Sequence, residues 1–303
     1  MSRCHRVRLT TQLVCAALAA GCGGDGEPTG PPSNLKLPAA LAFDSDRSLS
    51  RDIFVLDTDL QVRRLTQHAG LEGAASWSPD GKKVAYYTDQ TGDFEIFIVN
   101  ANGLGAVNLT QDSLADGFPD WSPDGTQISF HSNRGGTFDV WVMGSDGKNP
   151  VNLTADMEGD QGFPAWSPDG SRIAFHSQEP ADTNIYIMRA DGSGRRKLIG
   201  GPDFYGRPDW SPDGTRLVFD SDRGGVDDLF VIEADGTGLR NLTRDAPVDV
   251  DPAWSPDGNW IAYSSQKSGE DAEVMLIHPD GTGKVNVTRN DAFDAWPAWA
   301  PIP

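Results

Sequence analysis

The sequence predicts an all-β protein: a six-bladed β-propeller of four-stranded antiparallel blades, closed by N- and C-terminal strands that share one blade. Three observations favour this fold class. Tryptophans recur at steps of 44 or 45 residues, and five of them begin the phrase Trp-Ser-Pro-Asp-Gly. A strand-rich unit with this period is typical of a propeller blade. The N-terminal segment repeats the strands that the last unit lacks. The repeated tryptophans are Trp77, Trp121, Trp166, Trp210, Trp254 and Trp299.

One repeat shows how a blade forms. Polar and apolar residues alternate through much of it, as they do in half-buried strands. The Pro-Asp-Gly turn joins the first two strands, because proline sets φ and glycine accepts a positive φ. Four antiparallel strands joined by short turns make one blade. The strands are expected at residues 118–122, 127–132, 138–143 and 151–154.

The two chain ends are expected to complete one blade together. Complete repeats begin at the first five tryptophans, whereas the unit at Trp299 holds a single strand. Residues 41–47 match residues 217–223, and residues 52–55 match residues 228–231. The N-terminal segment therefore supplies three strands to the blade that begins at Trp299, which closes the ring without an open sheet edge.

The N-terminus indicates export. Arg3, Arg6 and Arg8 precede a short apolar run at 13–20, whose last two alanines begin the sequence Ala-Ala-Gly-Cys. We interpret residues 1–21 as a lipoprotein-type signal peptide, because Ala19 to Cys22 is similar to a bacterial lipobox with Cys22 as the lipidated residue. Cleavage at an Ala-x-Ala-like site, giving a soluble protein, is the alternative. Residues 22–38 read as a flexible tether, and residues 39–303 as the propeller.

Charge and cysteine content narrow the function classes. The 44 acidic and 25 basic residues give a net charge of −19, which disfavours nucleic acid and anionic lipid as partners. Contact with a membrane is therefore expected only through the lipid anchor. All three cysteines lie within the first 22 residues, so we expect neither a disulfide nor a cysteine metal site in the propeller.

The repeated phrases carry a family resemblance. Trp-Ser-Pro-Asp-Gly, Ile-Ala-Phe, Ser-Asp-Arg, Asp-Gly-Thr-Gly and Asn-Leu-Thr recur through residues 39–303. Together they resemble the TolB-like propeller family. This resemblance implies an extracytoplasmic bacterial propeller, in the periplasm or at the cell surface. TolB itself carries a further N-terminal α/β domain, for which this chain has no room, so the resemblance implies a propeller-only relative.

Counting from the tryptophans locates candidate ligand residues at the channel mouth. The residues five before and three before each tryptophan are rich in carboxylates and aromatic rings, which suit a peptide, a cationic ligand or a sugar. A carboxylate ring could also hold Ca²⁺. A solvated acidic loop without a function is the alternative. The candidates are Glu72, Asp116, Phe118, Gln161, Phe163, Tyr205, Arg207, Asp249, Asp251, Asp294 and Trp296, with Ala74 completing the second ring.

A third ring lies ten residues after each tryptophan. His131, His176 and Asp220 occupy it in successive blades, and these side chains could hold a divalent transition metal or act as acid and base. This is similar to propeller lyases that act on uronic-acid oligomers with a histidine-held metal, although the distinctive motifs of those enzymes are not evident. Hydrogen-bonded, inert residues between blades are the alternative. The remaining members are Asp44, Tyr87 and Ser264.

Other repeated residues are expected to be structural. The tryptophans would pack between blades. Arg47, Arg134 and Arg223 follow Ser-Asp or Ser-Asn at matching places, so each would brace a loop of its blade through an ion pair.

Two hypotheses of function follow. The first is a lipid-anchored, monomeric envelope protein without a cofactor that binds another envelope protein or a glycan, or acts as a scaffold. No catalytic residue is assigned in it, and no Gly-x-Ser-x-Gly nucleophile elbow occurs. The second is a metal-assisted polysaccharide lyase or hydrolase acting at the central channel mouth.

Overall fold

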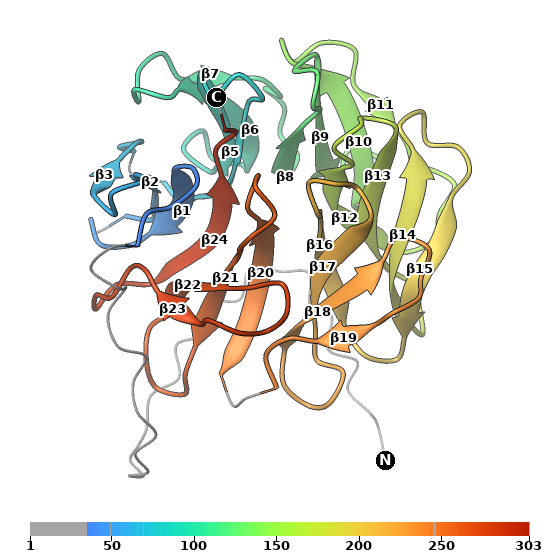
Figure 1. Cartoon of the computed structure of the whole chain (residues 1–303). Coiled ribbons are helices and arrows are strands. Elements are labelled where there is room, and N and C mark those ends of the chain that lie inside the picture. The colour runs from blue at the N-terminus through green and yellow to red at the C-terminus, as the bar shows by residue number, and fades with distance from the viewer. Residues whose placement is uncertain (1–34, 49, 69, 245–246, 303) are drawn as a thin grey trace, which may run out of the picture.

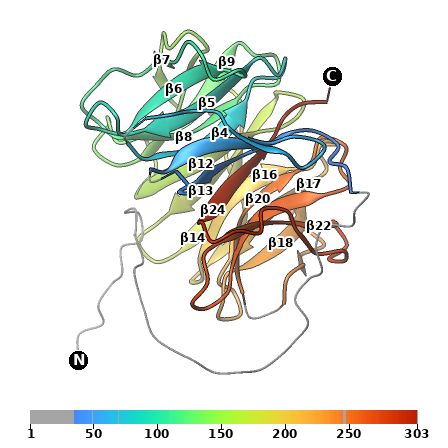
Figure 2. The same ribbon diagram turned by 90° about the vertical axis from the view of Figure 1, so that its left-hand side faces the viewer.

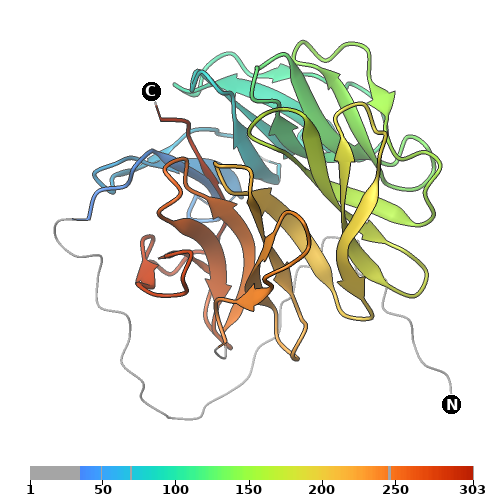
Figure 3. The same cartoon turned by 45° about the vertical axis from the view of Figure 1, so that its right-hand side comes forward.

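The computed structural model describes residues 35–48, 50–68, 70–244 and 247–302. In these ranges the chain forms six four-stranded antiparallel sheets arranged around a central axis (Figures 1 and 3). The predicted fold class is therefore confirmed. The proposed signal, most of the tether and Cys22 lie outside the described residues. None of the described segments is a helix with the length and hydropathy needed to cross a membrane.

The blades are numbered here from the one that both chain ends build. Blade 1 contains β24 (Asp294–Trp299), β1 (Leu41–Ser45), β2 (Asp52–Leu56) and β3 (Val62–Arg64). Blade 2 contains β4 (Glu72–Trp77), β5 (Lys83–Thr88), β6 (Glu95–Asn100) and β7 (Val107–Asn108). Blade 3 contains β8 (Asp116–Trp121), β9 (Gln127–Ser132), β10 (Asp139–Gly144) and β11 (Val151–Asn152).

The other three blades follow the same order from the inner to the outer strand. Blade 4 contains β12 (Asp160–Trp166), β13 (Arg172–Gln178), β14 (Thr183–Arg189) and β15 (Arg196–Gly201). Blade 5 contains β16 (Tyr205–Trp210), β17 (Arg216–Ser221), β18 (Asp228–Glu233) and β19 (Arg240–Asn241). Blade 6 contains β20 (Val248–Trp254), β21 (Ile261–Gln266), β22 (Glu273–Ile277) and β23 (Val285–Asn286).

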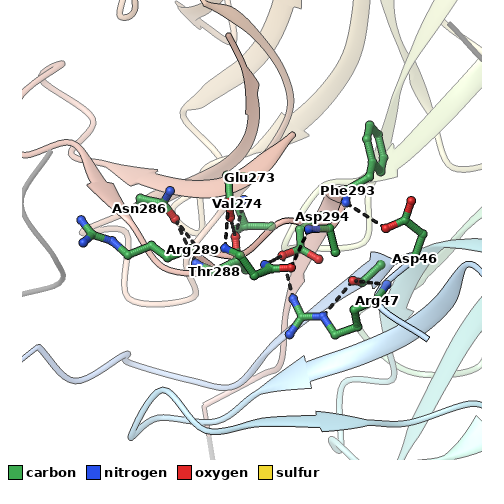
Figure 4. Close-up of polar contacts among 12 residues, drawn as sticks. Asp46, Arg47, Glu273, Val274, Asn286, Thr288, Arg289, Phe293 and Asp294 are labelled. Atoms are coloured by element: carbon green, nitrogen blue, oxygen red, sulfur yellow. Dashed lines mark hydrogen bonds and ion pairs between the residues drawn. The ribbon is translucent and has the colours of Figure 1, made fainter. Parts of the chain in front are cut away.

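Blade 1 closes the ring as the sequence predicts. Strand β24 pairs antiparallel with β1, with Trp299 opposite Leu41 and Asp294 opposite Ser45. Figure 2 shows β24 between the N-terminal strands and β20. The close-up in Figure 4 shows the polar contacts of this closure, in which Arg47 meets Asp294 and the Phe293 amide donates to Asp46 at 2.9 Å.

The apolar core is divided among the interfaces between blades. The described residues form six clusters of buried side chains, and each joins residues of two neighbouring blades. Trp210 is an example: it packs against Ala165 and Ala174 of blade 4, and its indole N–H donates to the Ala165 carbonyl at 3.2 Å. Burial of such rings is the main stabilising contribution between blades. Leu37, before β1, is also buried between blades 1 and 6.

Most outer strands are shorter than the sequence pattern suggests. In blade 3 the Thr154 hydroxyl accepts from the Val140 amide at 2.9 Å and donates to Asp139 at 3.0 Å. The Asn152 side-chain amide donates to the same carboxylate at 2.9 Å, and its side-chain oxygen accepts from the Thr154 backbone amide. This carboxylate–Asn–Thr clasp turns the chain away after two residues of β11. The expected strand at 151–154 therefore ends at Asn152.

Candidate functional site on the propeller axis

An irregularity occurs at the same point of all six inner strands. The register with the second strand shifts there, as between Gly117 and Asp120 of β8. The residue three before each repeat tryptophan has φ between 48° and 56°. The left-handed conformation costs a non-glycine residue about 1–2 kcal/mol, and a bulge re-aims the side chain. The six residues are Ala74, Phe118, Phe163, Arg207, Asp251 and Trp296.

The re-aimed side chains meet on the propeller axis. The rings of Phe118 and Phe163 have centroids 4.5 Å apart, and those of Phe118 and Trp296 are 4.8 Å apart. Phe163 and Trp296 come from opposite blades, yet their centroids are only 6.3 Å apart. We call these six residues the axial cluster. Its rings fill the channel at this level and remain partly exposed, so they form a floor instead of an open ring.

Next to its three aromatic rings, the axial cluster has a charged side. Arg207 forms ion pairs with Asp220 at 3.1 Å and with Asp251 at 3.0 Å, and its guanidinium lies 4.9 Å from the Trp296 ring centroid. Burial would lower the pKa of Arg207, but the two carboxylates raise it above its ordinary value. Burial also raises the pKa of Asp220 well above its usual range, against the influence of Arg207. The cluster therefore holds one fixed cation beside aromatic faces.

A second ion pair adjoins the charged side. Asp44 of β1 accepts a hydrogen bond from Arg51, whose guanidinium lies 4.4 Å from the Phe293 ring centroid. Burial raises the pKa of Asp44 to about 7, although Arg51 acts in the opposite direction. Ser264 donates to Asp251 at 2.9 Å. Blades 1, 5 and 6 thus contribute the charges, whereas the aromatic rings of the axial cluster come from blades 1, 3 and 4.

The two histidines of the third ring lie on the aromatic side. The His131 ring is 4.8 Å from Phe118, and Nδ1 of His176 is 2.6 Å from the Tyr205 carbonyl oxygen. Burial lowers the pKa of His131 to about 3 and that of His176 to about 4, so both rings are neutral at neutral pH. Tyr87 joins this side, with its ring 5.4 Å from Phe118.

The structure does not gather the proposed metal ligands. Asp220 is paired with Arg207, while His176 is engaged by a backbone carbonyl. Among the residues that the structure describes, no three or more His, Cys, Asp or Glu side chains are placed to hold a metal ion. The carboxylate ring expected for Ca²⁺ does not form either, since its members are buried and accept hydrogen bonds from other side chains.

The ring five residues before the tryptophans is buried, which corrects its expected position at the mouth. Each member is at most 3% exposed, so these are neither ligand-facing nor solvated side chains. Asp116 accepts two hydrogen bonds from Arg134, at 2.9 and 3.0 Å, and Asp249 accepts from Ser265 at 2.5 Å. The other members are engaged similarly: Glu72 by Thr66, Asp294 by Arg47, Gln161 with the Glu158 carbonyl, and Tyr205 against Phe219.

Four phenylalanines that the sequence analysis did not single out surround the axial cluster. All are partly exposed, and each lies directly before a strand. Phe138 is 4.8 Å from the His131 ring, and Phe204 is 5.4 Å from the His176 ring. An aromatic residue just ahead of a strand, in otherwise variable loops, is the signal that could have found them. We call Phe94, Phe138, Phe204 and Phe293 the aromatic rim.

The geometry defines a class first: a closed six-bladed propeller whose axis carries an aromatic and cationic floor. A family model described as the TolB beta propeller domain matches residues 27–156 and 148–302. The chain therefore belongs to the TolB beta-propeller domain family. No curated protein sequence matches it.

Solved structures show the same fold. TolB from Acinetobacter baumannii is 21% identical with a TM-score of 0.76, covering 87% of this chain and 67% of that one. A protein described as TolB from Agrobacterium tumefaciens is 21% identical with a TM-score of 0.70, covering 87% and 99%. An oligogalacturonate lyase in complex with manganese is 15% identical with a TM-score of 0.55, covering 81% and 72%. At these identities the likeness concerns the fold alone.

Proposed function

We propose that this protein is a binding or scaffold module of the bacterial cell envelope, held to a membrane by a lipid on Cys22. Its ligand, a segment of an envelope protein or a glycan, would rest on the axial cluster inside the aromatic rim. Membership of the TolB propeller family supports the envelope location and the binding role. The leader that precedes Cys22 supports the anchor.

The observation that carries the proposal is the shared left-handed conformation of the axial cluster. Six non-glycine residues keep φ near 50°, although glycine would relieve the strain at each of them. Strained backbone of this kind concentrates at functional sites. Here the strain presents three aromatic rings and one arginine together, side chains that are enriched in binding hot spots.

The chemistry of the floor defines what it can take. Aromatic faces stack on sugar rings or on apolar and aromatic side chains of a peptide. Arg207 adds a cation, but Asp220 and Asp251 already pair with it. We therefore expect apolar and stacking contacts to dominate binding, with charge adding orientation. The filled axis requires the ligand to lie on the floor, because it cannot pass between Phe163 and Trp296.

The test is a binding screen of the purified propeller against soluble envelope proteins and oligosaccharide fractions from the same cell. For any ligand found, Trp296→Ala should weaken binding about tenfold or more, as hot-spot truncations do. Phe118→Leu preserves apolar volume and should weaken binding to a smaller degree. Trp260→Ala is the matched control, because Trp260 stacks on His278, outside the axial cluster and its rim, with the two ring centroids 3.8 Å apart. If Trp296→Ala binds every ligand as tightly as Trp260→Ala and the unmodified protein do, the axial cluster is not the binding site.

A further inference from the structure

Blade 4 lacks the clasp that shortens the outer strands of blades 2, 3, 5 and 6. In blade 1, Arg64 stands in place of the asparagine and pairs with Asp52. A carboxylate begins the third strand of the other five blades, whereas Asn184 stands in the matching position of blade 4. Lys197 and Ile199 stand where blade 3 has Asn152 and Thr154. The clasp cannot form without its carboxylate and hydroxyl. The five carboxylates are Asp52, Glu95, Asp139, Asp228 and Glu273.

The outer strand of blade 4 is longer as a result. Strand β15 has six residues, whereas the outer strands of the other blades have two or three. It pairs with β14 from Arg196, opposite Ile187, to Gly201, opposite Thr183. Within the described ranges β15 ends its sheet, and Figure 1 shows it at the outer rim, away from the axis. Its free edge is a template on which another extended chain can pair.

The side chains along this edge are basic in an otherwise acidic protein. Arg196 and Lys197 are exposed and point to opposite faces of the sheet, since successive residues of a strand alternate. Arg196 reaches toward blade 5, where it donates to the Ala234 carbonyl. Lys197 lies opposite Tyr186, whose ring packs against the cluster shared with blade 3, so Lys197 is on that face.

A groove of about 400 Å³ lies beside the edge on the Lys197 face. Met157, Pro180 and the Tyr186 ring give it an apolar lining. Its charged groups are already engaged in part: Tyr186 donates to Glu179 at 2.6 Å, and Arg195 pairs with Asp156 at 2.7 Å. The remaining carboxylate of the lining belongs to Glu158.

We propose that the free edge of β15 binds an extended acidic segment of a partner protein, which pairs with it as a fifth strand of blade 4. Acidic side chains of the segment would lie opposite Arg196 and Lys197, because opposite charges on neighbouring strands attract. An apolar side chain next to them would enter the groove against Met157 and Tyr186. A second copy of this chain is disfavoured as the occupant, because its own β15 would place like charges opposite each other.

The probe is an eight-residue peptide with two central glutamates flanked on both sides by alternating valine and threonine. We expect it to bind the purified protein and to slow amide exchange in β15. Lys197→Glu should weaken binding about fivefold, the effect of losing one favourable cross-strand charge pair. Lys148→Glu is the matched control, since Lys148 is also exposed but lies on a turn of blade 3. This control should bind as the unmodified protein does.

A second variant tests the length of the strand, and because it also removes Lys197, its effect must exceed the loss caused by Lys197→Glu. Asn184→Asp, Lys197→Asn and Ile199→Thr together introduce the clasp of blade 3, and should shorten β15 and abolish binding while the blade stays folded. Three results would overturn the proposal. The first is that the peptide binds equally well when prolines replace its valines. The second is that the triple variant binds the peptide as the unmodified protein does. The third is that the unmodified protein sediments as a dimer and the triple variant as a monomer. The Trp296→Ala variant should leave this binding intact, which separates the β15 site from the site on the axial cluster.

Discussion

The Arg47 guanidinium donates a hydrogen bond to the Asp294 carboxylate over 2.7 Å, although 247 residues separate the two along the chain. Asp294 begins the inner strand of blade 1, and Arg47 follows its second strand. The Asp294 side chain is fully buried, whereas Arg47 is partly exposed above the rings of Phe43 and Phe54. This pair therefore fastens the two chain ends where the ring closes (Figure 4).

Replacing Arg47 should loosen the closure. Arg47→Ala leaves the buried Asp294 carboxylate without its cation, and we expect the free energy of unfolding to fall by about 2 kcal/mol, because breaking a buried pair strands a charge. Amide exchange in β1 and β24 should become faster. Chemical denaturation and hydrogen exchange measure the two effects.

Arg134→Ala is the matched control for this prediction. Arg134 holds Asp116 in the same way, but both residues belong to blade 3. It should destabilise the protein by a similar amount without faster exchange in β1 and β24. Equal exchange in the closing strands of both variants would show that the Arg47 pair does not secure the closure.

Asp209 should make stability depend on pH. Its carboxylate accepts from the Trp254 amide at 2.6 Å, and burial raises its pKa to about 7. Because folding favours the protonated form, this contribution to stability is complete below about pH 4 and is lost as pH rises through 7. Asp209→Asn imitates the protonated acid, so it should be more stable than the unmodified protein at pH 8, by on the order of 2 kcal/mol, and nearly equal to it at pH 4.

Denaturation at pH 4, 6 and 8 checks this difference. Asp80→Asn is a useful comparison, because hydrogen bonds from Ser78 and the Lys82 amide lower the pKa of Asp80. Asp80→Asn should change the pH dependence of the free energy of unfolding in the opposite direction to Asp209→Asn. Parallel pH curves for Asp209→Asn and the unmodified protein would contradict the assignment.

Ala74→Gly should stabilise the fold. Ala74 has φ +48° and is the smallest member of the axial cluster, so glycine removes backbone strain with little loss of packing. We expect a gain of about 0.5–1 kcal/mol in the free energy of unfolding, the left-handed penalty less the entropy cost of glycine. Ala85→Gly in β5, which lacks a positive φ, should destabilise instead. A loss of stability in both variants would mean that Ala74 is not strained.

Divalent metals should leave the melting temperature unchanged. In the described part of the chain, neither His131, His176 and Asp220 of the third ring nor the buried carboxylates are placed to hold a metal ion together. Melting with Mn²⁺, Zn²⁺ or Ca²⁺, and with a chelator, provides the measurement. A stoichiometric rise with Mn²⁺ that His176→Gln removes would instead support the metal-assisted hypothesis.

Much of the fold could be predicted because each repeat carries its own local instructions. The Ser-Pro-Asp-Gly phrase encodes a turn, as in Ser122 donating to Asp124 at 2.6 Å and Gly125 at φ +71°. The match between residues 41–47 and 217–223 predicted the shared blade. The braces of Arg47 and Arg134 were also predicted, although the partner of Arg47 comes from the other end of the chain.

The candidate site was predicted less well because facing direction depends on the bulge. A regular strand would place residues five and three before the tryptophan on one face. The bulge separates them, so that Asp116 turns into its blade and Phe118 turns toward the axis. The local signal for the bulge is a proline directly after the bulged residue in five of the six inner strands, because proline within a sheet is confined to edges and bulges.

The sequence by itself determined the blade count, the order of strands and the residues at equivalent positions, since these follow from a repeated local code. Only the tertiary structure decided which equivalent positions share space. Phe163 and Trp296 meet because six strands converge on one axis, and β15 is long because blade 4 lacks the clasp between its two outer strands. Such contacts depend on distances across the ring, which a one-dimensional period does not contain.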